Sequence, residues 1–252
     1  TAMKIAEALR GMGIGSQSLA MDDYFRTVNP RTAPRTPEGD IDFESPACLD
    51  MDLLGKHLNA LARGEEIHLP RYNFVTRVQS GPIGRPMRLG KDEVVVCEGI
   101  HALNDDIAAY CPDAFRLYIS ARSVVVDGDG QEIFKGTWMR LLRRLVRDSN
   151  FRGTPAAATL DMWANVRRGE KRFISPFKER ANLMFDSSFP CEVSIMKNFA
   201  APLLAAVPEG AERYAEIRSI LPALERFETI APALLAPESM LREFIGGGVY
   251  SY

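Results

Sequence analysis

The 252-residue sequence contains no apolar run long enough to cross a membrane, and its first residues lack the charged, apolar and small-residue regions of a signal peptide. Cysteine is scarce, with four residues in the whole chain and no C-x-x-C pair among them. This scarcity favours a reducing compartment, and we expect a cytoplasmic protein. The formal net charge of -2 gives no sign of a nucleic-acid partner, and we expect no membrane partner.

The composition is that of a soluble globular protein, with 46% hydrophobic and 25% charged residues. Its length suits one large α/β domain, or one domain with an appendage. The positive charge is unevenly distributed, because five arginines fall within one short segment: Arg140, Arg143, Arg144, Arg147 and Arg152. From this pattern alone, a solvated helix face and a phosphate-binding surface are both open.

One apolar run, Val94–Cys97, leads directly into Glu98 and a glycine. Such runs suit parallel strands that are buried on both faces, and ligands of α/β sheets gather at the carboxyl ends of these strands. A second short apolar segment ends on Asp22. We therefore expect two strands that end on carboxylates at one site, although a strand that merely ends on a polar residue is the alternative for each.

The other patterns predict helices, strands and turns of ordinary length. Asp127–Gly130 resembles part of a calcium-binding loop, but position 138 holds Trp138 where such a loop needs a glutamate, so we interpret it as a turn. The expected helices cover residues 1–9, 45–63, 138–149, 159–168, 177–181 and most of 192–244, the expected strands cover 115–120 and 183–186, a strand or hairpin covers 66–90, and a loop covers 29–45.

Phosphoryl transfer requires oxygen ligands for a metal, cations that neutralise the moving phosphoryl group, and a carboxylate that orients the attacking hydroxyl. Asp22 and Glu98 could supply the oxygens. The arginines of the basic segment could supply the positive charge, since a planar guanidinium grips phosphate oxygens with two hydrogen bonds.

Several short motifs, taken in order, resemble the uridine kinase and phosphoribulokinase family, and most of all its bacterial nucleoside kinase branch. Each motif is short by itself, but their common order makes the resemblance specific. It covers roughly residues 1–205, and Phe244–Gly247 is also similar. The motifs are Met21–Phe25, Asp42–Ser45, Pro70–Phe74, Cys97–His101, Arg140–Asp148, Trp163–Glu170 and Pro176–Phe177.

The resemblance implies an α/β fold with a P-loop NTPase-like parallel sheet flanked by helices, a small β-hairpin insertion and a helical C-terminal extension. By this likeness residues 1–205 form a nucleoside-kinase-like domain, with the hairpin at about 66–90 and a lid at about 138–175. Residues 206–252 then form the helical extension and a flexible tail.

The implied reaction is transfer of the γ-phosphate of ATP to the 5′-hydroxyl of a nucleoside such as uridine or cytidine, with Mg2+ as cofactor. By likeness Asp22 is the general base and lies near the magnesium. Glu98 holds the magnesium, partly through water. Glu44 binds the sugar hydroxyls of the nucleoside.

The remaining implied contacts concern the base and the phosphates. Tyr72 and Phe74 would lie against the base, although ordinary packing of the hairpin explains them equally well. Arg77 is a substrate-binding candidate, but it stands where nucleoside-specific uridine kinases place a histidine, which puts uridine preference in doubt. Arg144 would reach between substrate and phosphate. In the lid, Arg147 and Arg152 would contact ATP.

The sequence departs from the family pattern in its lack of a G-x-x-x-x-G-K-[ST] phosphate loop, which in the family directly precedes a helix resembling residues 1–9. Thr154 also stands where relatives often carry another arginine. Either the chain is a fragment that lacks its first strand and phosphate loop, or a kinase has lost its ATP cradle. We expect these 252 residues alone to be inactive.

Two other functions stay open at this point. One is a catalytically inactive nucleoside-binding or regulatory module, and the other is a kinase that acts on a sugar phosphate or another small alcohol. The sequence does not decide whether the protein forms a homo-oligomer.

Overall fold

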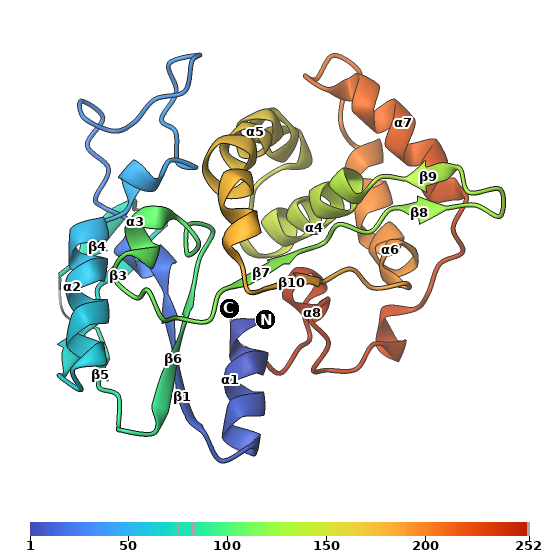
Figure 1. Cartoon of the computed structure of the whole chain (residues 1–252). Coiled ribbons are helices and arrows are strands. Elements are labelled where there is room, and N and C mark those ends of the chain that lie inside the picture. The colour runs from blue at the N-terminus through green and yellow to red at the C-terminus, as the bar shows by residue number, and fades with distance from the viewer. Residues whose placement is uncertain (75, 82–83, 251–252) are drawn as a thin grey trace. The chain divides into compact units, whose positions relative to one another are not determined.

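A computed structural model describes residues 1–74, 76–81 and 84–250, and its contacts divide the chain into two compact units (Figure 1). The first unit contains residues 1–118 and 165–183, and the second contains residues 119–164 and those from 184 onward. The predicted boundary at residue 205 falls inside the second unit. As a boundary between domains it stays a prediction.

The first unit is built on a parallel strand pair. After helix α1 (Ala2–Gly11), strand β1 (Gly15–Ala20) pairs with β6 (Glu93–Glu98) in a register that runs from Gly15 opposite Glu93 to Ala20 opposite Glu98. The α/β class and the parallel pairing are those expected from the sequence.

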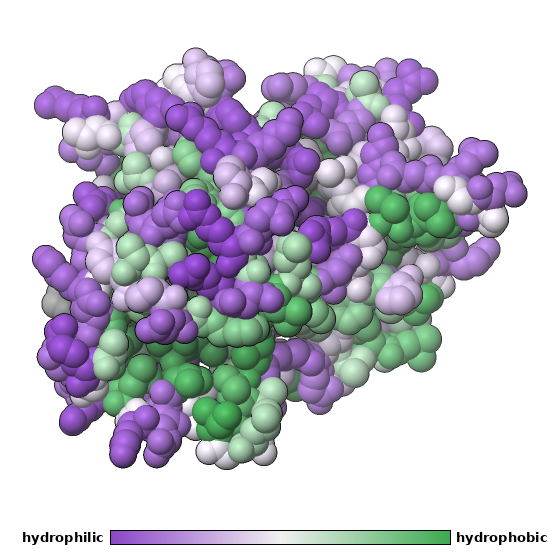
Figure 2. Space-filling view, in the orientation of Figure 1, coloured by the Kyte–Doolittle hydropathy of each residue, from purple (hydrophilic) through white to green (hydrophobic). Residues whose placement is uncertain are grey.

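The expected burial of the β6 strand on both faces is wrong. Val94 is 40% exposed, and no residue of β6 is fully buried. Within the part of the chain that the structure describes, β6 has β1 as its one strand neighbour, so its other edge is uncovered. Hydrophobic surface accordingly gathers over α1, β1 and β6 at the lower left of Figure 2.

The core of the first unit lies between the end of β1 and helix α2 (Met51–Ala62). Leu19 and Leu54 are completely buried there, and the Tyr24 hydroxyl lies 2.8 Å from Nδ1 of His57. The prediction that this helix begins at Ser45 is wrong. A separate 3-10 turn, η2 (Pro46–Cys48), follows Ser45, and α2 begins after Asp50, whose carboxylate accepts a hydrogen bond from the Leu53 N–H.

The predicted hairpin consists of two short antiparallel ladders. Strand β2 (Ile67–His68) pairs with β5 (Pro86–Met87), and β3 (Arg71–Asn73) pairs with β4 (Val78–Ser80). Residues 75, 82 and 83 of the predicted hairpin lie outside the described residues. The first unit also contains α3 (Asp105–Ala108), the π-helical turn η3 (Glu170–Ile174) and the 3-10 turn η4 (Ser175–Arg180).

The second unit is mostly helical. Its central helix, α4 (Gly136–Phe151), buries the apolar side that the sequence predicted, including Leu141, Leu142, Leu145 and Val146. Helices α6 (Glu192–Ala205) and α8 (Arg242–Ile245) pack against it, and α7 (Tyr214–Glu225) packs against α6. The 3-10 turn η5 (Pro232–Leu234) lies between α7 and α8 in the chain. Helix α5 (Ala156–Gly169) runs from the second unit into the first.

Proline usually ends a helix, but two prolines of the helical region lie inside helices. Pro202 lies in α6 and Pro222 in α7. An interior proline removes one helical hydrogen bond. Close packing offsets this loss, because Leu204 of α6 and Leu224 of α7 are completely buried.

The sheet elements of the second unit are short. The turn predicted at residues 127–130 joins β8 (Val125–Val126) to β9 (Glu132–Phe134) in an antiparallel hairpin that the sequence pattern did not predict. Strand β7 (Leu117–Ser120) pairs with β10 (Leu183–Asp186), and the chain passes between the units within both strands. None of the helices among the described residues is both long and apolar enough to span a bilayer.

The start of α4 gives a direct test of this packing. Helix propensity alone predicts that Gly136→Ala stabilises the protein by about 1 kcal/mol. In the structure an added Cβ would lie 2.9 Å from the Arg122 carbonyl oxygen, so we expect a loss of about 1–3 kcal/mol instead. Urea unfolding measures the difference. The control is Gly210→Ala in the same unit, where an added Cβ meets nothing within 4 Å and stability should not fall.

Candidate functional site

The two predicted strand-end carboxylates lie at the same end of the β1–β6 pair. Ala20 is the register partner of Glu98, and Asp22 follows two residues later in the 3-10 turn η1 (Met21–Tyr24). The turns after the two strands pack together, because a Cβ on Gly99 would lie 2.6 Å from the Cβ of Met21. Both carboxylates are exposed. The parallel register therefore brings Asp22 and Glu98 to the carboxyl end of the strand pair, as the sequence predicted.

This donor set suits magnesium that arrives with a nucleotide. Among the described residues, no group of three or more His, Cys, Asp or Glu side chains could enclose a metal ion. Magnesium usually binds one or two carboxylates and takes its other ligands from substrate phosphates and water. Asp22 and Glu98 therefore fit Mg2+ bound to ATP better than a metal held by the protein alone.

Asp23 connects the strand-end motif to the hairpin. The side chain is partly buried, and this burial raises the pKa of the Asp23 carboxyl, while a hydrogen bond from the Tyr72 backbone and the charge of Arg71 act against the increase. Sequence reasoning selected Asp22, the first acid of this motif, and did not select Asp23 as a site residue. Its bond to the Pro70–Phe74 motif identifies it as a link between the two motifs.

The aromatic residues of these motifs form one cluster. The ring of Tyr72 lies 5.4 Å from Phe25 and 4.9 Å from Phe74, measured between centroids. Tyr72 is 7% exposed, and burial raises the pKa of its hydroxyl. Phe74 is 59% exposed. Packing thus accounts for Tyr72, whereas Phe74 keeps a ring face that a ligand could reach.

Arg77 joins the hairpin to the Asp42–Ser45 motif. Its guanidinium lies 5.2 Å from the centroid of the Phe43 ring, a cation–π contact, and its carbonyl accepts a hydrogen bond from the Val28 N–H at 3.2 Å. The backbone of Arg77 has φ 56°, which is rare for a residue other than glycine. The structure therefore places Arg77 beside the segment that carries Glu44.

Glu44 is half-buried against the far end of α5. Its N–H donates to Oδ1 of Asp42 at 3.3 Å, and a Cβ on Gly169 would overlap the Glu44 side chain. Asp42 is itself buried. Glu44 is thus held between its own loop and the segment that leads into η3.

His101 is a buried residue of this region that the sequence reasoning did not select, although it closes the Cys97–His101 motif. It is 1% exposed, and its ring lies 6.3 Å from that of Phe173. Burial lowers the pKa of His101 to about 4, against the opposing influence of the Glu44 and Phe173 backbones and of Asp42. Neither ring nitrogen has a hydrogen-bond partner of good geometry among the described residues. The ring is therefore neutral at pH 7.

The three predicted phosphate-binding arginines lie in the second unit, where each pairs with an acid. Arg144 and Arg152 lie 3.3 and 3.0 Å from the carboxylate of Asp148, which is 1% exposed and also accepts a hydrogen bond from the Thr159 hydroxyl. Arg147 pairs with Glu243 of α8 at 3.4 Å, and burial lowers the pKa of its guanidinium. These pairs fix the arginines along α4.

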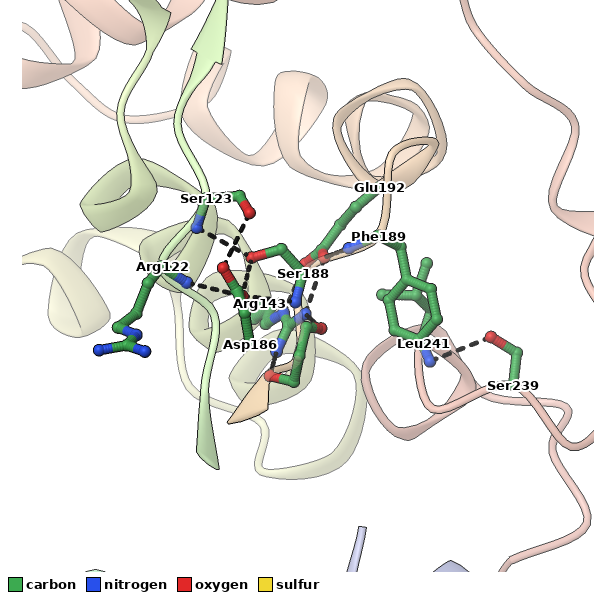
Figure 3. Close-up of polar contacts among 10 residues, drawn as sticks. Arg122, Ser123, Arg143, Asp186, Ser188, Phe189, Glu192, Ser239 and Leu241 are labelled. Carbon is green, nitrogen blue, oxygen red and sulfur yellow. Dashed lines mark hydrogen bonds and ion pairs between the residues drawn. The ribbon is translucent and has the colours of Figure 1, made fainter. Parts of the chain in front are cut away.

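A second polar network fixes the start of α6 (Figure 3). Arg143 forms two bonds with the fully buried carboxylate of Glu192. Nearby, Asp186 accepts hydrogen bonds from the Ser123 hydroxyl at 2.8 Å and from the Ser188 hydroxyl at 2.7 Å. Burial acts to raise the pKa of Asp186, but hydrogen bonds, chiefly those from Ser188, outweigh it and hold the pKa below its ordinary value. The pairing with the buried Glu192 carboxylate gives Arg143 a structural role.

The predicted site residues thus fall into two sets. The first unit holds Asp22, Glu44, Tyr72, Phe74, Arg77 and Glu98, and the second holds Arg144, Arg147 and Arg152. Within the first unit, four motifs come into contact around the carboxyl end of the strand pair: Met21–Phe25, Asp42–Ser45, Pro70–Phe74 and Cys97–His101. The role of each residue stays a prediction.

The buried histidine predicts a specific pH dependence. Because the folded-state pKa of His101 lies near 4 and the ordinary value is 6.5, the neutral ring stabilises the fold fully above pH 6.5, and this contribution falls as the pH drops towards 4. We expect it to decrease by about 1 kcal/mol per pH unit in that window. Urea unfolding at pH 7 and pH 5 should therefore show a smaller pH effect for His101→Asn than for the unaltered chain.

The control for this measurement is His68→Asn, which removes an exposed histidine on β2. It should keep the pH dependence of the unaltered chain. Equal pH dependence in all three proteins would contradict the assignment.

Comparisons with a family model and with known proteins both lead to the same family. A family model described as "Phosphoribulokinase / Uridine kinase family" matches residues 2–193. A uridine kinase of Halobacterium salinarum is 26% identical over 179 residues, which is 71% of this chain and 71% of that protein. A uridine kinase of Deinococcus deserti is 29% identical over 182 residues, which is 72% of this chain and 77% of that protein. Since the family model covers most of its length, the chain belongs to the phosphoribulokinase and uridine kinase family.

Proposed function

We propose that this protein transfers the γ-phosphate of ATP to the 5′-hydroxyl of a nucleoside, in the manner of a uridine or cytidine kinase. The observation that carries the proposal is the parallel register of β1 and β6, in which Asp22 and Glu98 both lie at the carboxyl end of the pair. The family membership supports the reaction class. ATP, Mg2+ and a nucleoside are the proposed ligands, and the cytoplasm is the proposed location.

The two strand-end acids have different proposed roles. Asp22 accepts the proton of the attacking hydroxyl and orients its oxygen, which is the task of a carboxylate in phosphoryl transfer. Glu98 holds the magnesium, partly through water. When bound, Mg2+ and ATP supply the phosphoryl group and neutralise its developing charge. Both carboxylates are exposed, so a nucleotide can approach them.

The acceptor is proposed to lie along the segment that joins Glu44 to the hairpin. Glu44 accepts hydrogen bonds from the sugar hydroxyls, and its firm seating against Gly169 favours a fixed geometry. The exposed ring of Phe74 stacks on the base, with Tyr72 supporting that ring from the core. Arg77 lies beside Phe43 and contributes a further substrate contact.

The basic helix is proposed to supply positive charge to the transferred group. Arg144 contacts both substrate and phosphate, while Arg147 and Arg152 contact ATP. Their ion pairs with Asp148 and Glu243 hold the guanidinium groups in defined positions at little cost in side-chain entropy on binding.

We further propose that turnover needs a phosphate loop, because its backbone N–H groups and lysine are the main donors to the β- and γ-phosphates. The 252 residues contain no G-x-x-x-x-G-K-[ST] motif. A phosphate-transfer assay with uridine, cytidine and adenosine should show negligible activity for these residues. Activity should appear when a strand and phosphate loop from a uridine kinase precede residue 1. Full activity without the loop would contradict this part of the proposal.

The roles of the two acids can be separated in that active chimaera. Asp22→Asn should lower kcat by roughly a hundredfold or more, since it removes the general base, and should change nucleoside binding little. Glu44→Ala should first weaken nucleoside binding, by about tenfold, because it removes hydrogen bonds to a charged acceptor. Steady-state kinetics and calorimetric titration with uridine measure the two effects.

The control is Asp52→Asn, which changes an exposed carboxylate on α2 and should alter neither kcat nor binding. If Glu44→Ala lowers kcat alone and Asp22→Asn lowers affinity alone, then the two roles are exchanged.

A further inference from the structure

The first unit has an open pocket of about 500 Å³ that the proposed reaction does not use. Four basic residues line it: Arg167, Arg168, Lys171 and Arg172. They lie on the last turn of α5 and on the π-helical turn η3 that continues it. Arg167 and Arg168 belong to the Trp163–Glu170 motif, but the sequence reasoning gave none of the four a binding role, because their concentration around one pocket is visible only in the folded chain.

Ion pairs neutralise two of these four cations. Arg167 pairs with Glu170. Arg168 lies 3.1 Å from Glu38 and 3.6 Å from the buried carboxylate of Asp42. These partners fix both guanidinium groups at the wall of the pocket.

The other two cations have no carboxylate partner in the described part of the chain. Lys171 and Arg172 are both exposed, and the guanidinium of Arg172 lies 5.0 Å from the centroid of the Phe173 ring. The stacked ring orients Arg172 without neutralising it. The pocket therefore presents two cations that no carboxylate pairs with, and the four cations exceed the three nearby carboxylates of Glu38, Asp42 and Glu170 by one charge.

The helix dipole gives part of a structural explanation for the cluster. Cations near the C-terminal end of a helix interact favourably with its dipole, and this applies both to Arg167 and Arg168 in the last turn of α5 and to Lys171 and Arg172 in the last turn of η3. Lys171 and Arg172 also stand four positions after Arg167 and Arg168, an arrangement in which like charges repel by a few tenths of a kcal/mol. Repulsion among the four cations therefore offsets part of the favourable dipole interaction.

We propose that this pocket binds a phosphate group, either as free phosphate or as a phosphate monoester. Such a group carries a charge of about −1.5 to −2 at pH 7, which matches the two unpaired cations. Arg172 can donate two parallel hydrogen bonds to phosphate oxygens, and Lys171 adds a compact charge.

The phosphate could belong to a substrate or be free in solution. Gly169, directly between the two pairs of basic residues, packs against Glu44. Only here does the inference rest on the proposed function: if Glu44 holds the acceptor, then the pocket lies beside the acceptor and can receive a phosphate that the acceptor already carries. Binding of phosphate in the pocket does not itself depend on any kinase activity.

Calorimetric titration of the 252-residue chain with inorganic phosphate, ribose 5-phosphate and ribose tests the proposal. Both phosphates should bind and ribose should not. The double variant Lys171→Ala with Arg172→Ala should lose at least about tenfold in affinity for both, because charge-assisted hydrogen bonds are removed. Tighter binding of ribose 5-phosphate than of inorganic phosphate identifies a sugar-borne phosphate, and equal binding identifies free phosphate; either supports the site.

The matched control is Lys56→Ala with Lys91→Ala, which removes the same charge from exposed positions of the first unit outside the pocket. It should bind phosphate normally. The proposal is overturned if neither phosphate binds, if both double variants lose affinity equally, or if the pocket variant binds as well as the unaltered chain. Circular dichroism verifies folding, and Lys171→Gln with Arg172→Gln replaces the alanine variant if that one does not fold. Because no turnover is measured, failure of the proposed kinase reaction leaves this result intact.

Discussion

The parallel pairing of β1 with β6 is the constraint on which the candidate site depends. Strand polarity decides where side chains meet: in this register Ala20 faces Glu98, so the turns that follow both strands begin at the same edge. An antiparallel pairing would have sent Asp22 and Glu98 to opposite ends. Close packing of Gly99 on Met21 keeps these turns together and leaves no room for a larger residue at position 99. The next residues of the chain then carry His101 into the core beside Glu44.

Around this edge, motifs that lie far apart in the sequence contact one another in pairs. Asp23 bonds to the backbone of Tyr72, Arg77 stacks on Phe43, and Gly169 packs against Glu44. Each contact joins one short motif to the next, so a change in one segment affects the seating of its neighbour. In the second unit the corresponding contacts are ion pairs. The buried acids Asp148 and Glu192 fix the arginines of α4. A buried acid left without its arginine would be costly, which explains why these pairs are complete.

Local sequence patterns predicted those helices and strands whose structure depends on their own residues and not on distant neighbours. The apolar run at residues 183–186 gives β10 with the expected bounds, and the apolar side of the basic helix is buried as expected. The strand-end acids were found because each of the two apolar segments leads directly into a carboxylate. Properties that depend on distant neighbours were missed. The exposure of β6 reflects an uncovered edge, Pro202 remains helical because α6 is packed, and neither the burial of His101 nor the basic pocket at Arg172 has a local signal.

The central claim is that Asp22 and Glu98 together receive the metal of a metal–nucleotide complex. Paramagnetic broadening by Mn2+ with ATP tests it most directly, because Mn2+ shares the oxygen preference of Mg2+ and the method detects weak binding. In NMR spectra of the chain, the amide signals of Asp22 and Glu98 should broaden first and together, and the double variant Asp22→Asn with Glu98→Gln should abolish the effect. Broadening that centres on other carboxylates, or that persists in the double variant, would contradict the account.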